Sequence, residues 1–201
     1  MNIQFPRIFR IFFRSFTWRK TPSEKVIYLT FDDGPVPEVT PGVLDILDVY
    51  GWKATFFCVG ENVRKHPELY EEILKRGHKT GNHSFNHIKG FNYSTEQYVA
   101  NVLKASEYID SNLFRPPYGR ITRKQAGILK NNFEIVMWDV ITHDYAKNLT
   151  IKDVFENVKK NVRNGSIVVF HDSLKAKENV LKVLPMSIEF WESKGYRFGV
   201  L

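Results

Sequence analysis

Two adjacent carboxylates, Asp32 and Asp33, stand at the end of a short hydrophobic run near the start of the chain. The run Val26–Phe31 is rich in β-branched and aromatic residues, which is typical of a buried strand, and Gly34-Pro35 ends it with a turn. Neighbouring carboxylates repel when both are ionised and shielded from water, so one is commonly tied to a cation while the other does different work. Taken alone, the stretch 30–35 is more typical of a solvated turn.

Two histidines four residues apart, His83 and His87, are a second candidate group. On a helical turn this spacing places both imidazoles on one face, within reach of a single metal ion. A carboxylate from the first strand would complete a His-His-Asp set with open coordination positions, which suits catalytic Zn²⁺ but also Fe²⁺, Co²⁺ or Ni²⁺. A lone pair with this spacing is more often two surface histidines on a loop, so its weight depends on the other polar groups.

The elements that would position these residues follow the pattern of repeated βα units, in which short apolar runs alternate with amphipathic stretches. The predicted strands are Val26–Phe31, Thr55–Val59, Lys79–Asn82, Leu113–Arg115, Glu134–Trp138, Ser166–Phe170 and Tyr196–Val200. The predicted helices are Pro41–Tyr50, Pro67–Arg76, Thr95–Ser111, Thr122–Asn131, Ile151–Val162 and Asn179–Lys194. The fold class is therefore α/β.

Polar residues follow the ends of several of these strands: Asp32 and Asp33, His83 to His87, Arg115 to Gly119, Asp139 and Asp144, and His171-Asp172. In a parallel barrel the active site is built at the carboxyl ends of the strands, so residues far apart in sequence can meet there. An ionisable group at a strand end, such as His171, is easier to explain by function than by packing.

Composition indicates one globular domain with a full core, since 43% of the 201 residues are hydrophobic and 14% are aromatic. The single cysteine, Cys58, lies in an apolar run, which favours a buried inert thiol. Residues 1–25 hold six basic residues and one acidic one, so +5 of the formal charge of +7 lies there. The nearly balanced remainder argues against a nucleic-acid-binding protein.

The basic N-terminal arm, residues 1–24, interleaves arginines with phenylalanines and isoleucines, and the helical spacing of the arginines makes an amphipathic helix over residues 1–20 a candidate. We expect this arm to pack on the barrel or to contact an anionic membrane surface peripherally. Arg10 and Arg14 interrupt the apolar run that a cleavable signal would need, and no transmembrane span is apparent, so we expect a cytoplasmic or peripheral membrane protein.

Together these segments resemble the polysaccharide deacetylase family, the NodB-homology domain of carbohydrate esterase family four. The family's first three motifs are matched by TFDDGP at 30–35, HSFNH at 83–87 and RPPYG at 115–119. The match covers roughly residues 25–201, which we take as the barrel domain. The resemblance implies a distorted (β/α)₇ barrel in a single domain. It also implies metal-dependent removal of N-acetyl groups from an amino-sugar polymer such as peptidoglycan, a chitin-like polymer or a capsular glycan.

Carried over by position, the resemblance implies roles for individual residues. Asp33, His83 and His87 match the metal ligands, Asp32 the catalytic base and His171 the general acid. Arg115 matches the arginine that pairs with the base, Asp144 the carboxylate that tunes the acid, and Tyr118 the backbone N–H that helps to bind the oxyanion. Substrate contacts are expected at Pro117, Tyr118, Tyr145 and Val169. Tyr145 stands where the family usually has Trp, and Val169 where it usually has Leu.

These roles agree with what amide hydrolysis requires, namely an activated water, a stabilised oxyanion and a proton for the departing amine. A metal can polarise the carbonyl and bring the pKa of its bound water toward about 7. We expect Zn²⁺, with Co²⁺, Ni²⁺ or Mn²⁺ as alternatives. Asp32 would accept the proton and His171 would protonate the nitrogen, which separates base from acid.

Three other functions remain open at this stage. A non-haem Fe²⁺ oxygenase uses two histidines and one carboxylate, but it needs neither Asp32 nor His171. The same site could hydrolyse a small amide or ureide. A non-catalytic sugar-binding barrel would normally have lost a base, a ligand or an acid, and here all five positions are filled. We expect an N-acetylated glycan as the partner, no nucleic acid, and a monomer.

Overall fold

The computed structural model describes residues 13–201. Its strands are β1 (Val26–Asp32), β2 (Thr55–Cys58), β3 (Lys79–Asn82), β4 (Leu113–Phe114), β5 (Glu134–Ile135), β6 (Val140–Ile141), β7 (Ile167–His171) and β8 (Arg197–Gly199). Its α-helices are α2 (Thr40–Tyr50), α3 (Gly60–Lys65), α4 (Pro67–Lys75), α5 (Thr95–Ala105), α6 (Arg123–Leu129), α7 (Ile151–Asn161) and α8 (Lys177–Ser193). Two 3₁₀ turns, η1 (Gly90–Asn92) and η2 (Pro117–Gly119), lie in loops after β3 and β4.

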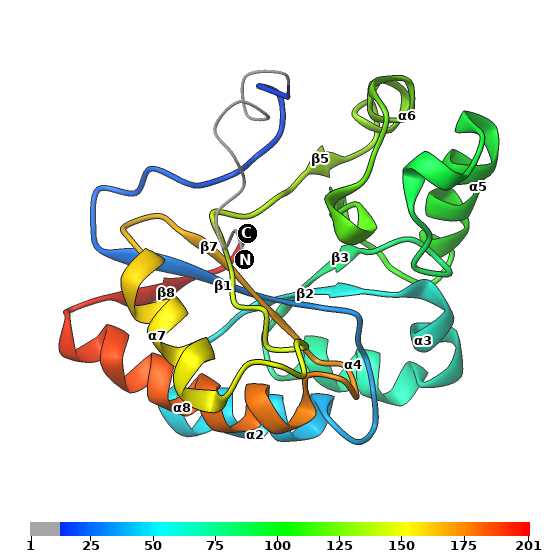
Figure 1. Cartoon of the computed structure of the whole chain (residues 1–201). Coiled ribbons are helices and arrows are strands. Elements are labelled where there is room, and N and C mark those ends of the chain that lie inside the picture. Colours follow the sequence, from blue (N-terminus) through cyan, green and yellow to red (C-terminus); the bar gives the residue numbers. More distant parts are fainter. Residues whose placement is uncertain (1–12) are drawn as a thin grey trace.

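All strand pairs in this sheet are parallel, and the order is β5-β4-β3-β2-β1-β7-β6. The outermost strands, β5 and β6, are joined by residues 136–139 alone, so the two edges must approach each other and the sheet curls (Figure 1). β8 pairs with the first half of β1, on the edge whose second half pairs with β2. The result is the distorted (β/α)₇ barrel that the sequence predicts.

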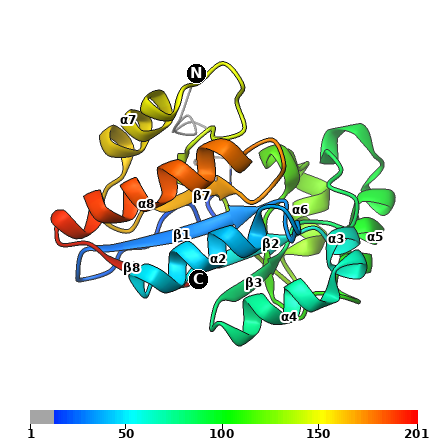
Figure 2. The ribbon, with the colours of Figure 1, turned by 90° about the horizontal axis from the view of Figure 1, so that it is seen from below.

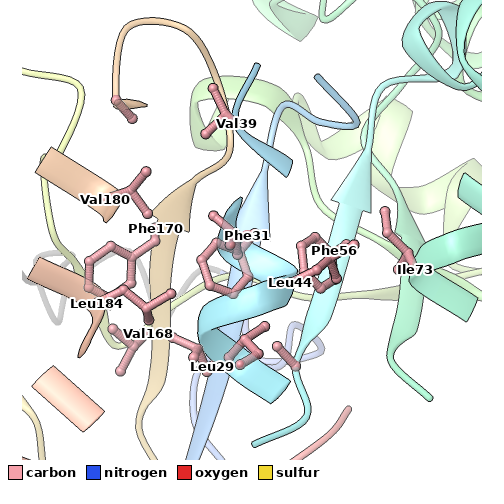
Figure 3. Close-up of a cluster of buried hydrophobic side chains, with 14 of the residues drawn as sticks. Leu29, Phe31, Val39, Leu44, Phe56, Ile73, Val168, Phe170, Val180 and Leu184 are labelled. Atoms are coloured by element: carbon pink, nitrogen blue, oxygen red, sulfur yellow. The ribbon is translucent and has the colours of Figure 1, made fainter. Parts of the chain in front are cut away.

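The two faces of the sheet bury different side chains, because successive residues of a strand point in opposite directions. Leu29 and Phe31 of β1 pack with Val168 and Phe170 of β7 in the outer layer, together with α2 and α8 (Figure 3). The alternate residues Ile167 and Val169 belong to a second cluster inside the barrel. α2 and α8 lie side by side across β1 (Figure 2). The polar residues lie at the carboxyl end of the barrel, beyond this apolar cluster.

The described part of the N-terminal arm runs between β5 and β7. The backbone N–H of Thr17 donates to the carbonyl of Ile135, and that of Lys20 donates to the carbonyl of Gly165. Gly165 has φ +76°, and a Cβ there would lie 2.0 Å from the Lys20 carbonyl oxygen, so only glycine allows this approach. Phe16 and Trp18 are buried in the cluster inside the barrel.

The helix expected over residues 1–20 is wrong for residues 13–20, which form a turn and two isolated strand bridges instead. Residues 1–12 lie outside the described part of the chain, so the expected helix is not tested there. The packing of Phe16 and Trp18 on the barrel agrees with one of the two expected fates of the arm. Within residues 13–201, no helix combines the length and apolar character needed to cross a bilayer.

The remaining elements match the predicted ones with three differences. The predicted strand Glu134–Trp138 is shortened to β5 (Glu134–Ile135), α5 ends at Ala105 rather than Ser111, and the short elements β6 (Val140–Ile141) and α3 were not predicted. Ser94, Thr122 and Thr150 cap α5, α6 and α7 with reciprocal side-chain hydrogen bonds, which fixes where these helices begin. Cys58 is free and fully buried, and burial raises the pKa of its thiol well above the usual value, as expected of an inert residue.

Candidate active site

Asp32 and Arg115 form an ion pair at the carboxyl end of the barrel. The guanidinium Nη1 donates to Asp32 Oδ1 at 2.6 Å, and both side chains are almost completely buried. Arg115 also donates to the Thr30 hydroxyl at 2.8 Å and to the carbonyls of Val136 and Met137. These bonds fix the guanidinium, so Oδ1 of Asp32 is held by the hydrogen bond from Arg115. Its other oxygen, Oδ2, lies 3.9 Å from Nε2 of His83.

Asp33, His83 and His87 gather into a group that could hold a metal ion, with one ligand atom of each within 4.8 Å of the others. Nε2 of His87 lies 3.1 Å from Asp33 Oδ1, and Nε2 of His83 lies 3.8 Å from the same oxygen. Nδ1 of His83 donates to the Arg115 carbonyl at 2.7 Å, and this bond selects the tautomer whose free lone pair is on Nε2.

The protonation states of this group also fit a cation. Burial lowers the pKa of His83 to about 4, so the imidazole is neutral at neutral pH, the form that binds metals. Burial raises the pKa of Asp33, but its hydrogen bond with His87 and the charge of His171 outweigh burial and hold this pKa below its usual range. Two imidazoles and one carboxylate are a donor set for a divalent ion with open positions.

The two histidines do not lie on a helical turn, which corrects the geometry expected from their spacing. Residues 83–87 form an irregular loop in which Ser84 has φ +62° and His87 has φ +53°. The side chain of Asn82 accepts from the Ser84 N–H, and the side chain of Asn101 accepts from the N–H of Phe85. These bonds replace helical ones and turn both imidazoles toward Asp33.

His171 and Asp144 form a second buried pair. Nδ1 of His171 lies 2.7 Å from Asp144 Oδ1, and the backbone N–H of His171 donates to Oδ2 of the same carboxylate. Burial lowers the pKa of His171, but the charge of Asp144 and the hydrogen bond to it, with smaller effects of Asp33 and Asp32, raise it to about 9. The protonated imidazole therefore presents an Nε2–H to the cavity.

Asp172, which follows His171, holds the turn that carries Asp33. Its carboxylate accepts from the Gly34 N–H at 2.9 Å and from the Thr40 hydroxyl at 2.7 Å. A Cβ at Gly34 would overlap this carboxylate, so the turn requires glycine. Burial and the charge of Asp33 raise the pKa of Asp172 to about 7, against the hydrogen bonds from Thr40 and Gly34.

One cavity of about 1020 Å³ joins these groups. Its polar floor includes Asp32, Asp33, His83, His87 and His171, and Tyr118 and Tyr145 stand at its walls. The Tyr145 ring meets His171 edge-on, with ring centroids 4.7 Å apart, and its hydroxyl lies 3.0 Å from Nδ1 of His143.

Three residues singled out from the sequence lie elsewhere. Val169 is fully buried in the cluster inside the barrel, and Pro117 is buried in η2; neither lines the cavity. Asp139 forms a two-point ion pair with Arg163 and accepts from Ser166, at the opposite end of β7.

Several cavity residues were not found by sequence reasoning. Asn62 donates to the carbonyl of Asp33 at 2.8 Å, and Phe13, Phe16 and Trp18 of the arm form an apolar end of the cavity. The alternation of apolar residues with arginines in the arm did not predict that the arm lines the cavity. That position depends on the pairing of Thr17 with β5, which the local sequence does not show.

Comparisons with known proteins identify relatives along nearly the whole chain. A family model described as polysaccharide deacetylase matches residues 19–132. A peptidoglycan-N-acetylglucosamine deacetylase of Bacillus cereus is 35% identical over an alignment of 195 positions, which covers 90% of this chain and 89% of that protein. A chitooligosaccharide deacetylase of Azorhizobium caulinodans is 30% identical over 191 residues, covering 91% and 86% of the two chains.

The fold is shared as well. The crystal structure of the peptidoglycan N-acetylglucosamine deacetylase Bc1960 superposes with a TM-score of 0.88 at 31% identity, covering 93% of this chain and 91% of that one. The match to the family model ends before Asp144 and His171, but the relatives named above extend across most of the chain.

Proposed function

The chain belongs to the polysaccharide deacetylase family, and from that premise we propose that its cavity hydrolyses the N-acetyl group of an amino sugar within a glycan polymer. The related proteins act, by their names, on peptidoglycan and on chitooligosaccharides, and both contain N-acetylated sugars. The observation that carries the proposal is the separation of two proton-handling groups, each with its own buried partner, around one metal-binding group.

Asp32 is the base in this proposal. Arg115 occupies Oδ1 and keeps the carboxylate charged and in place, which leaves Oδ2 to take a proton from the attacking water. A divalent cation held by Asp33, His83 and His87, with Zn²⁺ as our first choice, would polarise the acetyl carbonyl and make water more acidic.

His171 is the acid. The water oxygen first adds to the carbonyl carbon, which converts the C=O bond to an oxyanion. The oxyanion then re-forms the C=O bond as the bond between carbon and nitrogen breaks, and Nε2–H of His171 gives its proton to the departing amine. Asp144 keeps the imidazole protonated until that moment. The products are acetate and a free amino group on the sugar. Tyr118 would add its backbone N–H to the stabilisation of the oxyanion.

The test is acetate release by the purified protein from chitotetraose and from soluble peptidoglycan fragments. Dialysis against a chelator should abolish release, and reconstitution with Zn²⁺, Co²⁺, Ni²⁺ or Mn²⁺ should restore it and identify the best metal. A panel of small amides and ureides serves as the comparison. Release from small amides only would contradict the glycan substrate, and release that survives the chelator would contradict the role of a metal.

A further inference from the structure

A second hollow adjoins the catalytic cavity beside the start of α8. Its volume is about 670 Å³, and Leu174 and Lys175 line both spaces, so the two adjoin at these residues. The charged residues of its lining are Lys147, Lys175, Lys177, Lys182 and Glu178. Four cations and one anion therefore line a space that adjoins the catalytic cavity.

Most of this positive charge is not neutralised by neighbours. Lys182 pairs with Glu178 at 3.2 Å. Lys147, Lys175 and Lys177 are exposed and form no ion pair within residues 13–201. Exposed ammonium groups attract anions most where several of them face one concave space. The lining of the hollow therefore favours negative charge.

The hollow is also held in a fixed relation to the acid pair. The side-chain amide of Asn179, which lines the hollow, donates to the backbone carbonyl of Asp144 at 2.8 Å. Asp144 in turn holds His171. A group bound in the hollow would thus sit next to the residue that protonates the departing nitrogen.

Cations stand on the far side of the catalytic cavity too. Nζ of Lys89 lies 4.5 Å from the centre of the Tyr118 ring, and the Arg120 guanidinium lies 5.8 Å from that of Phe91. Both rings are more than half exposed, at 53% and 58%. Both sides of the cavity therefore carry cations that attract an acidic polymer.

We propose that the hollow binds a carboxylate of the glycan, carried by the sugar unit next to the one that loses its acetyl group, and that acidic glycans are therefore preferred over neutral ones. This inference rests on the proposed function, since it assigns the substrate class of the same site. Peptidoglycan fragments carry such carboxylates, whereas chitooligosaccharides do not.

An anionic bilayer is the other partner that the lysines of the hollow could bind. The glycan is favoured because the hollow is concave and adjoins the cavity at Leu174 and Lys175, so one bound polymer can reach both.

The experiment compares kcat/KM on soluble peptidoglycan fragments with kcat/KM on the same fragments after their carboxylates have been amidated. The variant is Lys147→Gln combined with Lys177→Gln, which leaves Lys175 beside the catalytic cavity in place. Two exposed charge contacts predict a fall of about fivefold on intact fragments relative to amidated ones. Added salt should reduce the wild-type preference for intact fragments.

Two control variants isolate the position and the charge. Lys75→Gln with Lys130→Gln makes the same charge change on exposed residues that line neither space, and should keep the preference. Lys147→Arg with Lys177→Arg keeps the charge and should keep the preference as well. An equal fall on intact and amidated fragments, or the same fall in the control, would overturn the proposal.

Two further measurements separate this proposal from its alternatives. Binding of intact and amidated fragments by calorimetry in Asp32→Asn protein tests the hollow even if no acetate is released, so a failure of the proposed function remains distinguishable. Sedimentation with anionic vesicles tests the bilayer. Loss of vesicle binding in the Lys147→Gln, Lys177→Gln variant, with an unchanged glycan preference, would assign the lysines to a membrane and overturn the proposal.

Discussion

The loops before the strands and the loops after them, which lie at the amino and carboxyl edges of the sheet, reverse the chain with different residues. Where strands begin, the left-handed positions are glycines: Gly51, Gly77, Gly165 and Gly195. At the carboxyl edge the left-handed positions, apart from Gly119, are residues with side chains. They are Asp33, Ser84, His87, Tyr118 and His143. A left-handed conformation costs a residue with a Cβ about 1–2 kcal/mol. The carboxyl edge keeps these residues in spite of that cost.

The difference shows where functional residues are kept although they strain the backbone. A turn at the amino edge needs only to reverse the chain direction, and glycine does this without strain. At the carboxyl edge the left-handed conformation directs a functional group, as when it turns His87 toward Asp33, with Nε2 of His87 3.1 Å from Oδ1 of Asp33. Surrounding bonds hold such residues, for example the bond from Asn62 to the carbonyl of Asp33.

The largest expected effect comes from removing a proposed ligand at the strained edge. His83→Ala should lose its divalent metal and its acetate release together, because the remaining two ligands leave the ion weakly held. Elemental analysis of the purified variant and the acetate assay measure both. His66→Ala, outside the cavity, is the matched control. Stoichiometric metal in His83→Ala would show that the loop serves another purpose.

The next effect separates two neighbours with different backbone conformations. Asp32→Asn should keep the metal but lose about 10²–10⁴ in kcat, the usual contribution of a general base. Asp33→Asn should lose the metal instead. The two variants are compared by metal content and by kcat at saturating substrate. If Asp32→Asn protein is the one that lacks metal, the two carboxylates have been assigned in the wrong order.

A smaller effect concerns the pH dependence of the acid. Because the pKa of His171 is raised to about 9, kcat should fall as pH rises through about 9. The same shift contributes stability that is complete below pH 6.5 and is lost as pH rises through about 9. In Asp144→Asn the descending limb of kcat should move to lower pH, since burial then acts without its counter-charge. An unmoved limb would assign it to another group.

The smallest effects test the contrast between the two edges directly. Gly51 has φ +66° and no atom within 4 Å of an added Cβ, so Gly51→Ala should cost about 1 kcal/mol of stability from backbone strain alone. Ser84 has φ +62° and is fully buried, and its hydroxyl has no hydrogen-bond partner among the described residues. Ser84→Gly should therefore stabilise the fold by about 1 kcal/mol, after the entropy of glycine in the unfolded chain is subtracted.

Urea denaturation measures both changes as shifts of the midpoint at constant slope. Opposite signs for the two variants would sharpen the comparison. A destabilised Ser84→Gly protein would break it, because the left-handed conformation at the carboxyl edge would then be favoured by its side chain.

The sequence was informative where local pattern and tertiary structure agree. β1 is predicted to within one residue, since an apolar run bounded by turn residues is typical of a buried strand, and β3 is predicted to the residue although its sequence KTGN is not apolar. The end of β5 at Ile135 and the separate strand β6 were not predictable, because Val136, Met137 and Trp138 are all apolar and only barrel closure decides where pairing changes. The HxxxH spacing predicted a helical turn, whereas hydrogen bonds accepted by Asn82 and Asn101 hold His83 and His87 in an irregular loop.

The position of the arm has a consequence for the order of folding. Thr17 bonds to Glu134, 117 residues away, and Asn164 reaches Pro22 across 142 residues. These are among the contacts of highest sequence separation that the arm makes, and such contacts close late because their loops carry a large entropic cost. Residues 17–22 must therefore wait until β5 and β7 exist before they can dock. This segment of the arm reaches its native contacts only at the end of folding.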